Sequence, residues 1–282
     1  MKIVRRIGVN AYPHEREQLS RLGVELPHTP GSPSSMEVFL LDEADERWPA
    51  VRDWFLRRGE PPGWAETIFT AAEINAARWL NFQPAWHHGY PQPEDDFGYL
   101  TVTYDGKGCR QCGTGYNQRE PFRMVGEPRW GTRGLLQMNW VFDEYFVRPE
   151  IAAWLRERFN VHSEVVLNRR GRALENVRRV VVEEVVSMPT ADLPVSVCSM
   201  CGVGKIPPIR RGPMRQLAAP PAGHIARTRE WFGDGHSAFR EVVVSRDLRV
   251  ALDAARVRGQ RYRPVAEGRW EDPGGRSAGL HS

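Results

Sequence analysis

The chain contains four cysteines, and they form two copies of one short pattern. The first copy is Cys109-Arg-Gln-Cys112-Gly113 and the second is Cys198-Ser-Met-Cys201-Gly202. A spacing of two residues lets both sulfur atoms of a pair face one ion, and two pairs complete the tetrahedral set of thiolates that structural zinc prefers. The glycine after each second cysteine suits a turn that needs a positive φ angle. The pattern therefore predicts one structural Zn²⁺ bound by Cys109, Cys112, Cys198 and Cys201.

An iron site and a redox-active dithiol are the alternatives to structural zinc. Arg110 beside Cys109 favours redox chemistry by stabilising a thiolate, but a thioredoxin-like motif does not require a second, distant pair. A catalytic zinc keeps one coordination position open, usually with His or carboxylate ligands, and four thiolates leave none. The spacing therefore favours a structural ion that ties two distant parts of the chain together.

The composition is that of a folded protein, with 41% hydrophobic and 26% charged residues in a chain of 282. No apolar run approaches the roughly 18 residues that a membrane-spanning helix needs. The first ten residues lack the apolar segment of a secretory signal. We therefore expect a cytoplasmic protein without a membrane partner, where paired cysteines bind metal more often than they form disulfides.

Apolar runs and turn residues alternate in the first hundred positions. Thr70 and Glu73 form a capping box at the start of a helix, and Pro49 suits the first turn of another. The expected elements are strands at residues 2–8, 37–41 and 97–104 and helices at residues 49–59 and 70–80, with a loop at residues 27–35.

Two segments in the C-terminal half are similar to each other. Residues 142–155 align with residues 239–252, sharing Phe, Glu, Val and Leu at the same offsets, and a short β-prone run follows each of them at residues 164–167 and 261–265. The pattern predicts two related β-α-β units, with one cysteine pair ahead of each, although strand-helix junctions can match by chance. The valine-rich run at residues 177–186 is typical of a strand in the middle of a sheet.

The last third of the chain is basic, with 15 Lys and Arg against 8 Asp and Glu between residues 203 and 282. The segment after the second cysteine pair is the best candidate for contacts with nucleic-acid phosphates, and its cations are Lys205, Arg210, Arg211 and Arg215. Its prolines fit an extended, soluble connector equally well. Nucleic-acid binding therefore stands as an alternative function.

Catalytic motifs are weak in this chain. No complete phosphate-binding loop or nucleophile elbow is present. His87 and His88 lie near three acids at residues 94–96, but a solvated, proline-rich loop explains them as well. An enzyme would have to use these histidines or His224 and His236. We therefore expect that the protein is not an enzyme.

The two Cys-x-x-Cys-Gly motifs, each followed by a strand-helix unit, and the ending from residue 248 to 265 with its Val257-Arg-Gly259 turn resemble the double-CXXCG motif proteins of myxobacteria. The resemblance covers residues 108–265, and the first hundred residues depart from the family pattern. Members include swarming-inhibition immunity proteins, which protect a cell against a toxin delivered by its kin. The resemblance implies metal ligation by the four cysteines and a toxin as protein partner, and it brings no catalytic residue.

Together these observations predict an α+β fold with a mixed or antiparallel sheet and short helices. Its two β-α-β-like units would be joined by a zinc-ribbon-type four-cysteine site. The expected organisation is an N-terminal elaboration at residues 1–104, packed on a zinc-stapled core at residues 105–267, and a flexible tail at residues 268–282. The functional hypothesis is a non-enzymatic zinc-binding scaffold that acts as a protein-interaction module, in the manner of an immunity protein that neutralises a toxin.

Overall fold

The computed structural model describes residues 1–10, 12–26 and 36–268, and these form an α+β fold with mixed and antiparallel sheets and short helices, as expected. The described residues divide into two compact units: Met1–Glu73 with Arg210–Pro213, and Ile74–Ile209 with residues 214–268. No helix in the described part of the chain has the length and apolar character needed to cross a lipid bilayer. The loop expected at residues 27–35 lies outside the described residues, as does the tail expected at residues 268–282 apart from Gly268.

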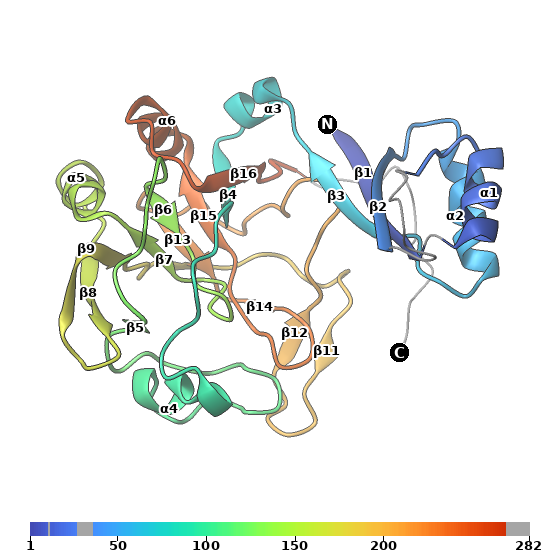
Figure 1. Cartoon of the computed structure of the whole chain (residues 1–282). Helices are drawn as coiled ribbons and strands as arrows, with labels where there is room; N and C mark the ends of the chain where they lie inside the picture. Colours follow the sequence, from blue (N-terminus) through green and yellow to red (C-terminus); the bar gives the residue numbers. More distant parts are fainter. Residues whose placement is uncertain (11, 27–35, 269–282) are drawn as a thin grey trace. The chain divides into compact units, whose positions relative to one another are not determined.

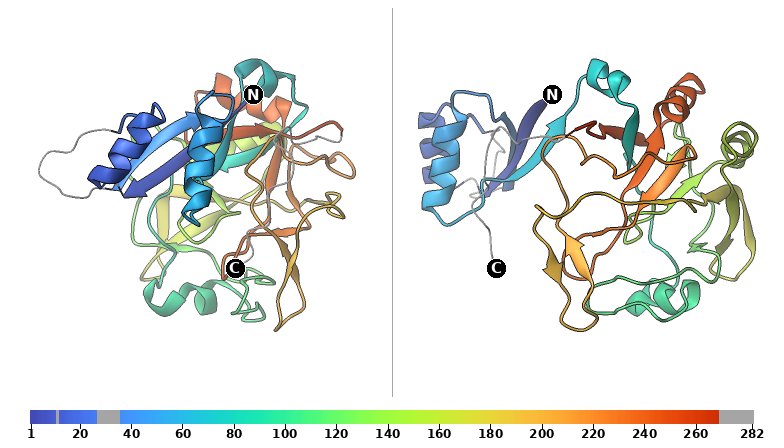
Figure 2. Two further views of the ribbon diagram at one scale, coloured as in Figure 1. Left: turned by 90° about the vertical axis from the view of Figure 1, so that its right-hand side faces the viewer. Right: turned by 180° about the vertical axis from the view of Figure 1, so that it is seen from behind.

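The first unit is a three-stranded antiparallel sheet with two helices. Its order is β2-β1-β3, formed by β1 (Lys2–Asn10), β2 (Met36–Asp42) and β3 (Trp64–Ile68). Helices α1 (Pro13–Arg21) and α2 (Trp48–Arg57) lie on the same face of this sheet (Figures 1 and 2). Ile7, Leu19, Val51 and Phe55 are almost completely buried between sheet and helices. The strands expected at residues 2–8 and 37–41 and the helix at residues 49–59 are confirmed.

The described part of the second unit contains three sheets. The first, in the order β5-β8-β9-β7-β6, consists of β5 (Arg123–Met124), β8 (Ser163–Asn168), β9 (Ala173–Val180), β7 (Tyr145–Val147) and β6 (Leu135–Leu136). The second, in the order β10-β13-β15-β4-β16, consists of β10 (Val185–Val186), β13 (Ile225–Thr228), β15 (Val242–Ser245), β4 (Trp79–Pro84) and β16 (Gln260–Pro264). The third is small, in the order β11-β12-β14, and consists of β11 (Ser196–Val197), β12 (Gly204–Ile206) and β14 (Trp231–Phe232).

The two larger sheets contain the expected β-α-β units. In one, helix α5 (Pro149–Phe159) connects β7 to β8; in the other, α6 (Arg246–Ala254) connects β15 to β16. The two strands of each unit do not touch, because an antiparallel strand lies between them: β9 in the first sheet and β4 in the second. Figure 1 shows β4 between β15 and β16. The strand order β6-β7-β9-β8 thus matches β13-β15-β4-β16.

The register of the strands matches as well. Phe146 pairs with Arg179 across β7 and β9, and Val243 pairs with Asn81 across β15 and β4. Phe146 and Val243 are each the fifth residue of their aligned segment, and each pairs with the middle strand of its sheet. The repeat inferred from residues 142–155 and 239–252 is therefore present in the fold, with one difference. The middle strand follows the unit as a hairpin in the first sheet, whereas in the second it comes from earlier in the chain.

Both helices of the repeat pack into one apolar core. Leu155 of α5 and Leu252 of α6 are buried in the same cluster as Val147, Val180 and Val244 from the two sheets. The hydroxyl of Ser245 caps α6 by accepting the backbone N–H of Leu248 at 3.1 Å, as the sequence predicted. The two crossover helices thus share one apolar core with strands of both larger sheets.

Several expected elements differ from the structure. Residues 97–104 were expected to be a strand, but a 3₁₀ turn (η1, Asp95–Phe97) leads into a short helix, α4 (Tyr99–Thr103). Its aromatic and β-branched residues favour a strand, yet Tyr99 and Thr103, four positions apart, are its buried residues, so tertiary packing overrides the local preference.

The helix expected at residues 70–80 is shorter than predicted. The capping box forms, with the Thr70 N–H donating to Glu73 at 2.8 Å, but α3 (Ala71–Ala76) ends before the chain enters β4. Because β4 is hydrogen bonded between β15 and β16, the boundary expected after residue 104 falls inside the second unit. The chain changes unit near residue 73 instead.

The packing of α6 predicts the effect of truncating its buried face. Leu252→Ala should lower the free energy of unfolding of the second unit by about 2–5 kcal/mol, because it leaves a cavity in the core. Val250→Ala, on the exposed face of the same helix, should change it by less than about 0.5 kcal/mol. Urea denaturation measures both, and equal effects would contradict the placement of α6.

Candidate metal centre and a buried charge network

The two cysteine pairs, 89 positions apart in the chain, come together in the second unit. The sulfur atoms of Cys109 and Cys198 are 3.9 Å apart, those of Cys112 and Cys201 are 3.5 Å apart, and all four lie within 4.8 Å of one another. Four sulfurs bound to one ion at about 2.3 Å would be separated by about 3.8 Å along each edge of a tetrahedron. The cluster is therefore consistent with a metal ion, and all four cysteines are free thiols.

The two pairs are held by the same local backbone structure, which we call the first knuckle (residues 109–114) and the second knuckle (residues 198–203). In each, the N–H of the first cysteine donates to the carbonyl oxygen five positions later, at 2.8 and 3.0 Å. The N–H of the glycine donates back to the first cysteine, at 2.8 and 2.9 Å. Gly113 and Gly202 have φ angles of 77° and 72°, which confirms the positive values that the sequence predicted.

The sulfur atoms lie in different electrostatic surroundings. The backbone N–H of Val203 lowers the pKa of Cys201 to about 6, and the N–H of Cys201 lowers the pKa of Cys198. Burial raises the pKa of Cys112 to about 11, although the hydroxyl of Thr114, 3.1 Å from its sulfur, opposes this effect. The second knuckle thus favours thiolates through its backbone, and the first holds a buried thiol that a cation would stabilise as thiolate.

Lys205 connects the two knuckles. It is only 4% exposed, and its ammonium donates to the carbonyl oxygens of Cys112, Gly235 and Ser237 at 2.8, 2.6 and 2.9 Å. An ammonium group has three N–H donors, so all of them are used. From the sequence, Lys205 is a candidate for phosphate contacts, but the structure gives it an internal role, because β12 places it beside the first knuckle.

The other basic candidates also have partners, each within its own unit. Arg211 forms an ion pair with Glu43 at 2.5 Å, and the Arg210 guanidinium lies 4.6 Å from the ring centre of Trp64, all in the first unit. Arg215 pairs with Asp192 at 2.8 Å in the second unit. The four candidate cations are therefore divided between the two units.

The histidines do not assemble a second metal centre in the part of the chain that the structure describes, where only the four cysteines bring three or more ligand atoms together. His87 lies 3.2 Å from the side-chain oxygen of Gln137, and burial lowers the pKa of His88. His224 lies 2.8 Å from the Ser245 hydroxyl, which is already engaged as the cap of α6.

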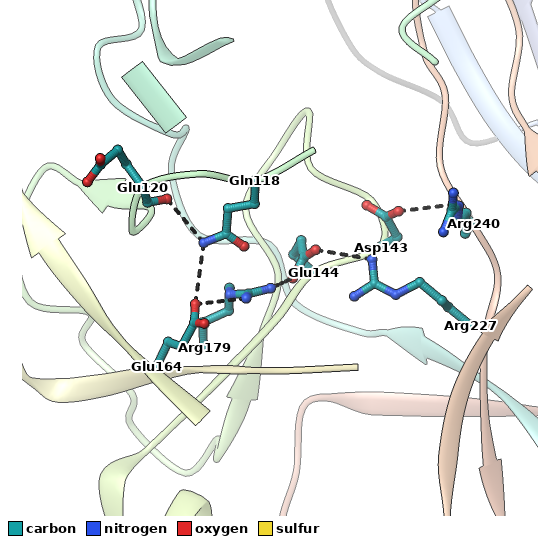
Figure 3. A network of polar contacts seen from close by, with 8 residues as sticks. All are labelled: Gln118, Glu120, Asp143, Glu144, Glu164, Arg179, Arg227 and Arg240. Carbon is teal, nitrogen blue, oxygen red and sulfur yellow. Dashed lines mark hydrogen bonds and ion pairs between the residues drawn. The ribbon is translucent and has the colours of Figure 1, made fainter. Parts of the chain in front are cut away.

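A buried network of charges, which the sequence analysis did not identify, lies in the same unit (Figure 3). Glu144 accepts hydrogen bonds from Arg179 and, at 3.4 Å, from Arg227. Arg179 also donates to Glu164 at 2.8 Å. Glu144 and Arg179 are each less than 10% exposed. The Nε atoms of Arg179 and Arg227 are buried without a partner among the described residues, so the network retains unused donors.

Asp143 lies at the edge of the same network. It accepts the backbone N–H of Arg240 at 3.2 Å, as Figure 3 shows. Burial, and then the neighbouring charge of Glu144, raise the pKa of Asp143 to about 6. This carboxyl group is therefore less firmly ionised near neutral pH than an exposed aspartate.

The second sheet contains an equivalent polar row. Glu241 occupies the position of Glu144 in the aligned segments, and it accepts a hydrogen bond from Asn81, the counterpart of Arg179, at 2.8 Å. Burial raises the pKa of Glu241 and lowers that of nearby Arg263 to about 10. The glutamate shared by the two aligned segments therefore pointed to this network in the sequence. The arginine partners of Glu144 could not be predicted in this way, because they come from other parts of the chain.

Comparison of the chain with models of known protein families gave no match, and comparison with curated protein sequences gave none either.

The two knuckle glycines form a matched pair for mutation. Gly202→Ala should lower the free energy of unfolding by about 1–2 kcal/mol, because alanine is strained at positive φ, and the space around it is open. Gly113→Ala should cost clearly more, because its added carbon would lie 2.3 Å from the carbonyl oxygen of His236. Urea denaturation of both variants tests this order, and equal losses would contradict the close packing.

Lys205→Met should lower the free energy of unfolding by about 2 kcal/mol or more, because it leaves buried carbonyl oxygens without donors. Lys107→Met, at an exposed position just before the first knuckle, is the control and should change it by less than about 0.5 kcal/mol. Thermal and urea unfolding measure both. A Lys205 variant as stable as the control would mean that the internal hydrogen bonds contribute little.

Proposed function

We propose that the four cysteines bind one structural Zn²⁺ and that the chain is a non-enzymatic scaffold acting as a protein-interaction module. The observation that carries the metal assignment is the meeting of four sulfur atoms at separations of 3.5 to 4.8 Å. Four thiolates fill the tetrahedral sphere of zinc and leave no position for a substrate, which fits a structural ion. When bound, the ion supplies a cross-link between the two knuckles.

The cross-link would join the first knuckle to the β11-β12 hairpin. The first knuckle precedes the first β-α-β unit, and the second knuckle closes the β11-β12 hairpin ahead of the second unit. Because a site of this kind does not exist in the unfolded chain, the free energy of metal binding adds to the free energy of folding. The ion thereby stabilises the hairpin against the first knuckle, together with Lys205.

Elemental analysis of the purified protein should give one zinc per chain. Removal of the ion by a strong chelator, or the substitution Cys198→Ser, should lower the melting temperature of the second unit, because the cross-link is lost. Lys107→Met provides a variant with the metal site intact. A protein that purifies without metal and melts at the same temperature as the zinc-loaded form would contradict the proposal.

Exposed apolar side chains beside the metal centre support a protein partner. Val195, Val197 and Met200 are 49%, 67% and 70% exposed, and all three lie in or next to the hairpin of the second knuckle. Contiguous exposed apolar surface on a soluble protein often marks a site of protein interaction. The metal would hold this surface, which we call the knuckle surface, in a fixed shape.

We propose a toxin as the partner because of the resemblance of residues 108–265 to double-CXXCG immunity proteins. The test is co-expression with the product of a toxin-like gene next to the gene of this chain. The intact chain should restore growth and co-purify with the toxin, whereas Met200→Gln should lose both while keeping its zinc. Val125→Ser, at a 59% exposed apolar residue outside the knuckle surface, is the control and should protect fully. Failure of the intact chain to bind or protect against any such toxin would contradict the proposed function.

A further inference from the structure

The second unit contains a cleft of about 1060 Å³, large enough for a ligand of drug or nucleotide size. Its lining comes from η1 and α4, the first knuckle, the segment before β7, the end of β9 and the loop after β14. Asp143, Glu144, Arg179 and Arg227 of the buried charge network form part of it, whereas Glu164 does not. The cleft is therefore a separate feature from the zinc site, although the two are adjacent through Arg110 and Gly113.

Aromatic side chains on a strained backbone line one side of the cleft. Five described residues other than glycine have positive φ angles, and they are Asp96, Phe97, Trp140, Asn160 and Arg256. The last two end helices α5 and α6, where this conformation is common. The other three all line the cleft. Strain of this kind persists where the surrounding structure holds a functional side chain in place.

The rings of Phe97 and Trp140 form an aromatic cluster, with their planes tilted 43° to each other. Their centres are 4.6 Å apart, and the ring of Tyr99 stacks near Trp140 at 6.1 Å with planes 21° apart. Phe97 remains 52% exposed despite its size. An exposed aromatic ring backed by further rings is suited to stacking on a planar group of a ligand.

Arginines line the interior of the cleft. Arg179, Arg227 and Arg240 lie there with two buried carboxylates, Asp143 and Glu144, and Arg179 also pairs with Glu164, whose side chain is 48% exposed. The Nε atom of each arginine is buried without a hydrogen-bond partner among the described residues. Buried donors of this kind are costly unless a ligand or water accepts their hydrogen bonds.

Arg227 and Arg240 also influence each other electrostatically. Burial, and then the charge of Arg227, lower the pKa of Arg240, whose guanidinium lies 4.6 Å from the ring centre of Trp231. An anionic ligand beside the two guanidinium groups would act with Asp143 to offset this repulsion and would accept hydrogen bonds from their unpartnered Nε atoms. Phosphate and carboxylate oxygens fit the fork of a guanidinium best.

Other ligand classes fit less well. A cation would meet the unpartnered guanidinium donors of the interior, because the acids Asp96, Glu183 and Asp234 lie at exposed positions. A neutral sugar would stack on the aromatic side, but its hydroxyl groups would form weaker hydrogen bonds with the guanidinium groups than an anion does. A ligand with a planar ring at one end and an anionic group at the other satisfies both sides of the cleft.

We propose that this cleft binds a nucleoside phosphate, with the base on the Phe97 and Trp140 rings and the phosphate on Arg227 and Arg240. The inference does not depend on the toxin partner or on the identity of the metal. It adds a small-molecule site to a chain whose sequence contains no phosphate-binding loop.

Titration calorimetry of the full-length, metal-loaded protein at low ionic strength tests the proposal, with adenosine 5′-monophosphate, adenosine, inorganic phosphate and benzoate as probes. We expect one site per chain for the nucleotide and at least about tenfold weaker binding of each other probe, since the base and the phosphate each contribute. Equal binding of phosphate alone would remove the role of the rings. If benzoate bound more tightly than adenosine 5′-monophosphate, the site would prefer a carboxylate ligand, and the proposal would be overturned.

Three variants separate a built site from adventitious binding. Arg240→Met keeps the apolar contact with Trp231 but removes the charge, and it should weaken nucleotide binding about tenfold or more. Phe97→Asn removes the ring with a residue that tolerates positive φ, and it should also weaken binding. Arg170→Met, at an exposed arginine outside the cleft, should bind within about twofold of the intact chain. No nucleotide binding at about 1 mM, or binding unchanged in both cleft variants, would overturn the proposal.

Discussion

The meeting of the two knuckles is the constraint on which the second unit depends. Two chain segments 89 positions apart place four sulfur atoms within 4.8 Å. The ammonium of Lys205, from the strand after the second knuckle, donates to the Cys112 carbonyl oxygen of the first knuckle and to the Gly235 and Ser237 carbonyl oxygens of the loop after β14. The four-sulfur cluster and a buried cation thus lie at one junction. Because Gly113 leaves no space for a side chain beside His236, the loop after β14 is held against the same junction.

The second unit consists of two crossovers built on one plan. In each, a helix connects parallel strands that are separated by an antiparallel strand, and the pairing of Phe146 with Arg179 has its counterpart in Val243 with Asn81. The rings of Phe142 and Phe239, at equivalent positions, lie 6.0 Å apart and contact each other edge to face. The two halves differ in the origin of the middle strand. Strand β9 follows the first crossover in the chain, whereas β4 precedes both crossovers.

The equivalent polar rows explain why the proposed binding site is on one half only. Glu241 is matched to the amide of Asn81, so its row contains few spare donors. In the other half the counterpart of Asn81 is Arg179, and Arg227 joins the same glutamate from β13. The unused donors therefore occur in the half where the position equivalent to Asn81 is occupied by Arg179. Arg240 and the aromatic side of the cleft add to this same half.

The sequence alone predicted the cluster of four cysteines from the shared pattern of its two pairs, and it predicted the positive φ angles of their glycines and the repeated strand-helix units from residues a few positions apart. Tertiary structure decided what local patterns do not encode. Burial of Tyr99 and Thr103 made a helix from a strand-like segment, and β4 joined a sheet formed mostly by the distant C-terminal strands. Lys205 reads as an exposed cation in the sequence, but three carbonyl oxygens enclose it. The cleft is likewise invisible in the sequence, since its rings and arginines come from segments that meet only in the folded chain.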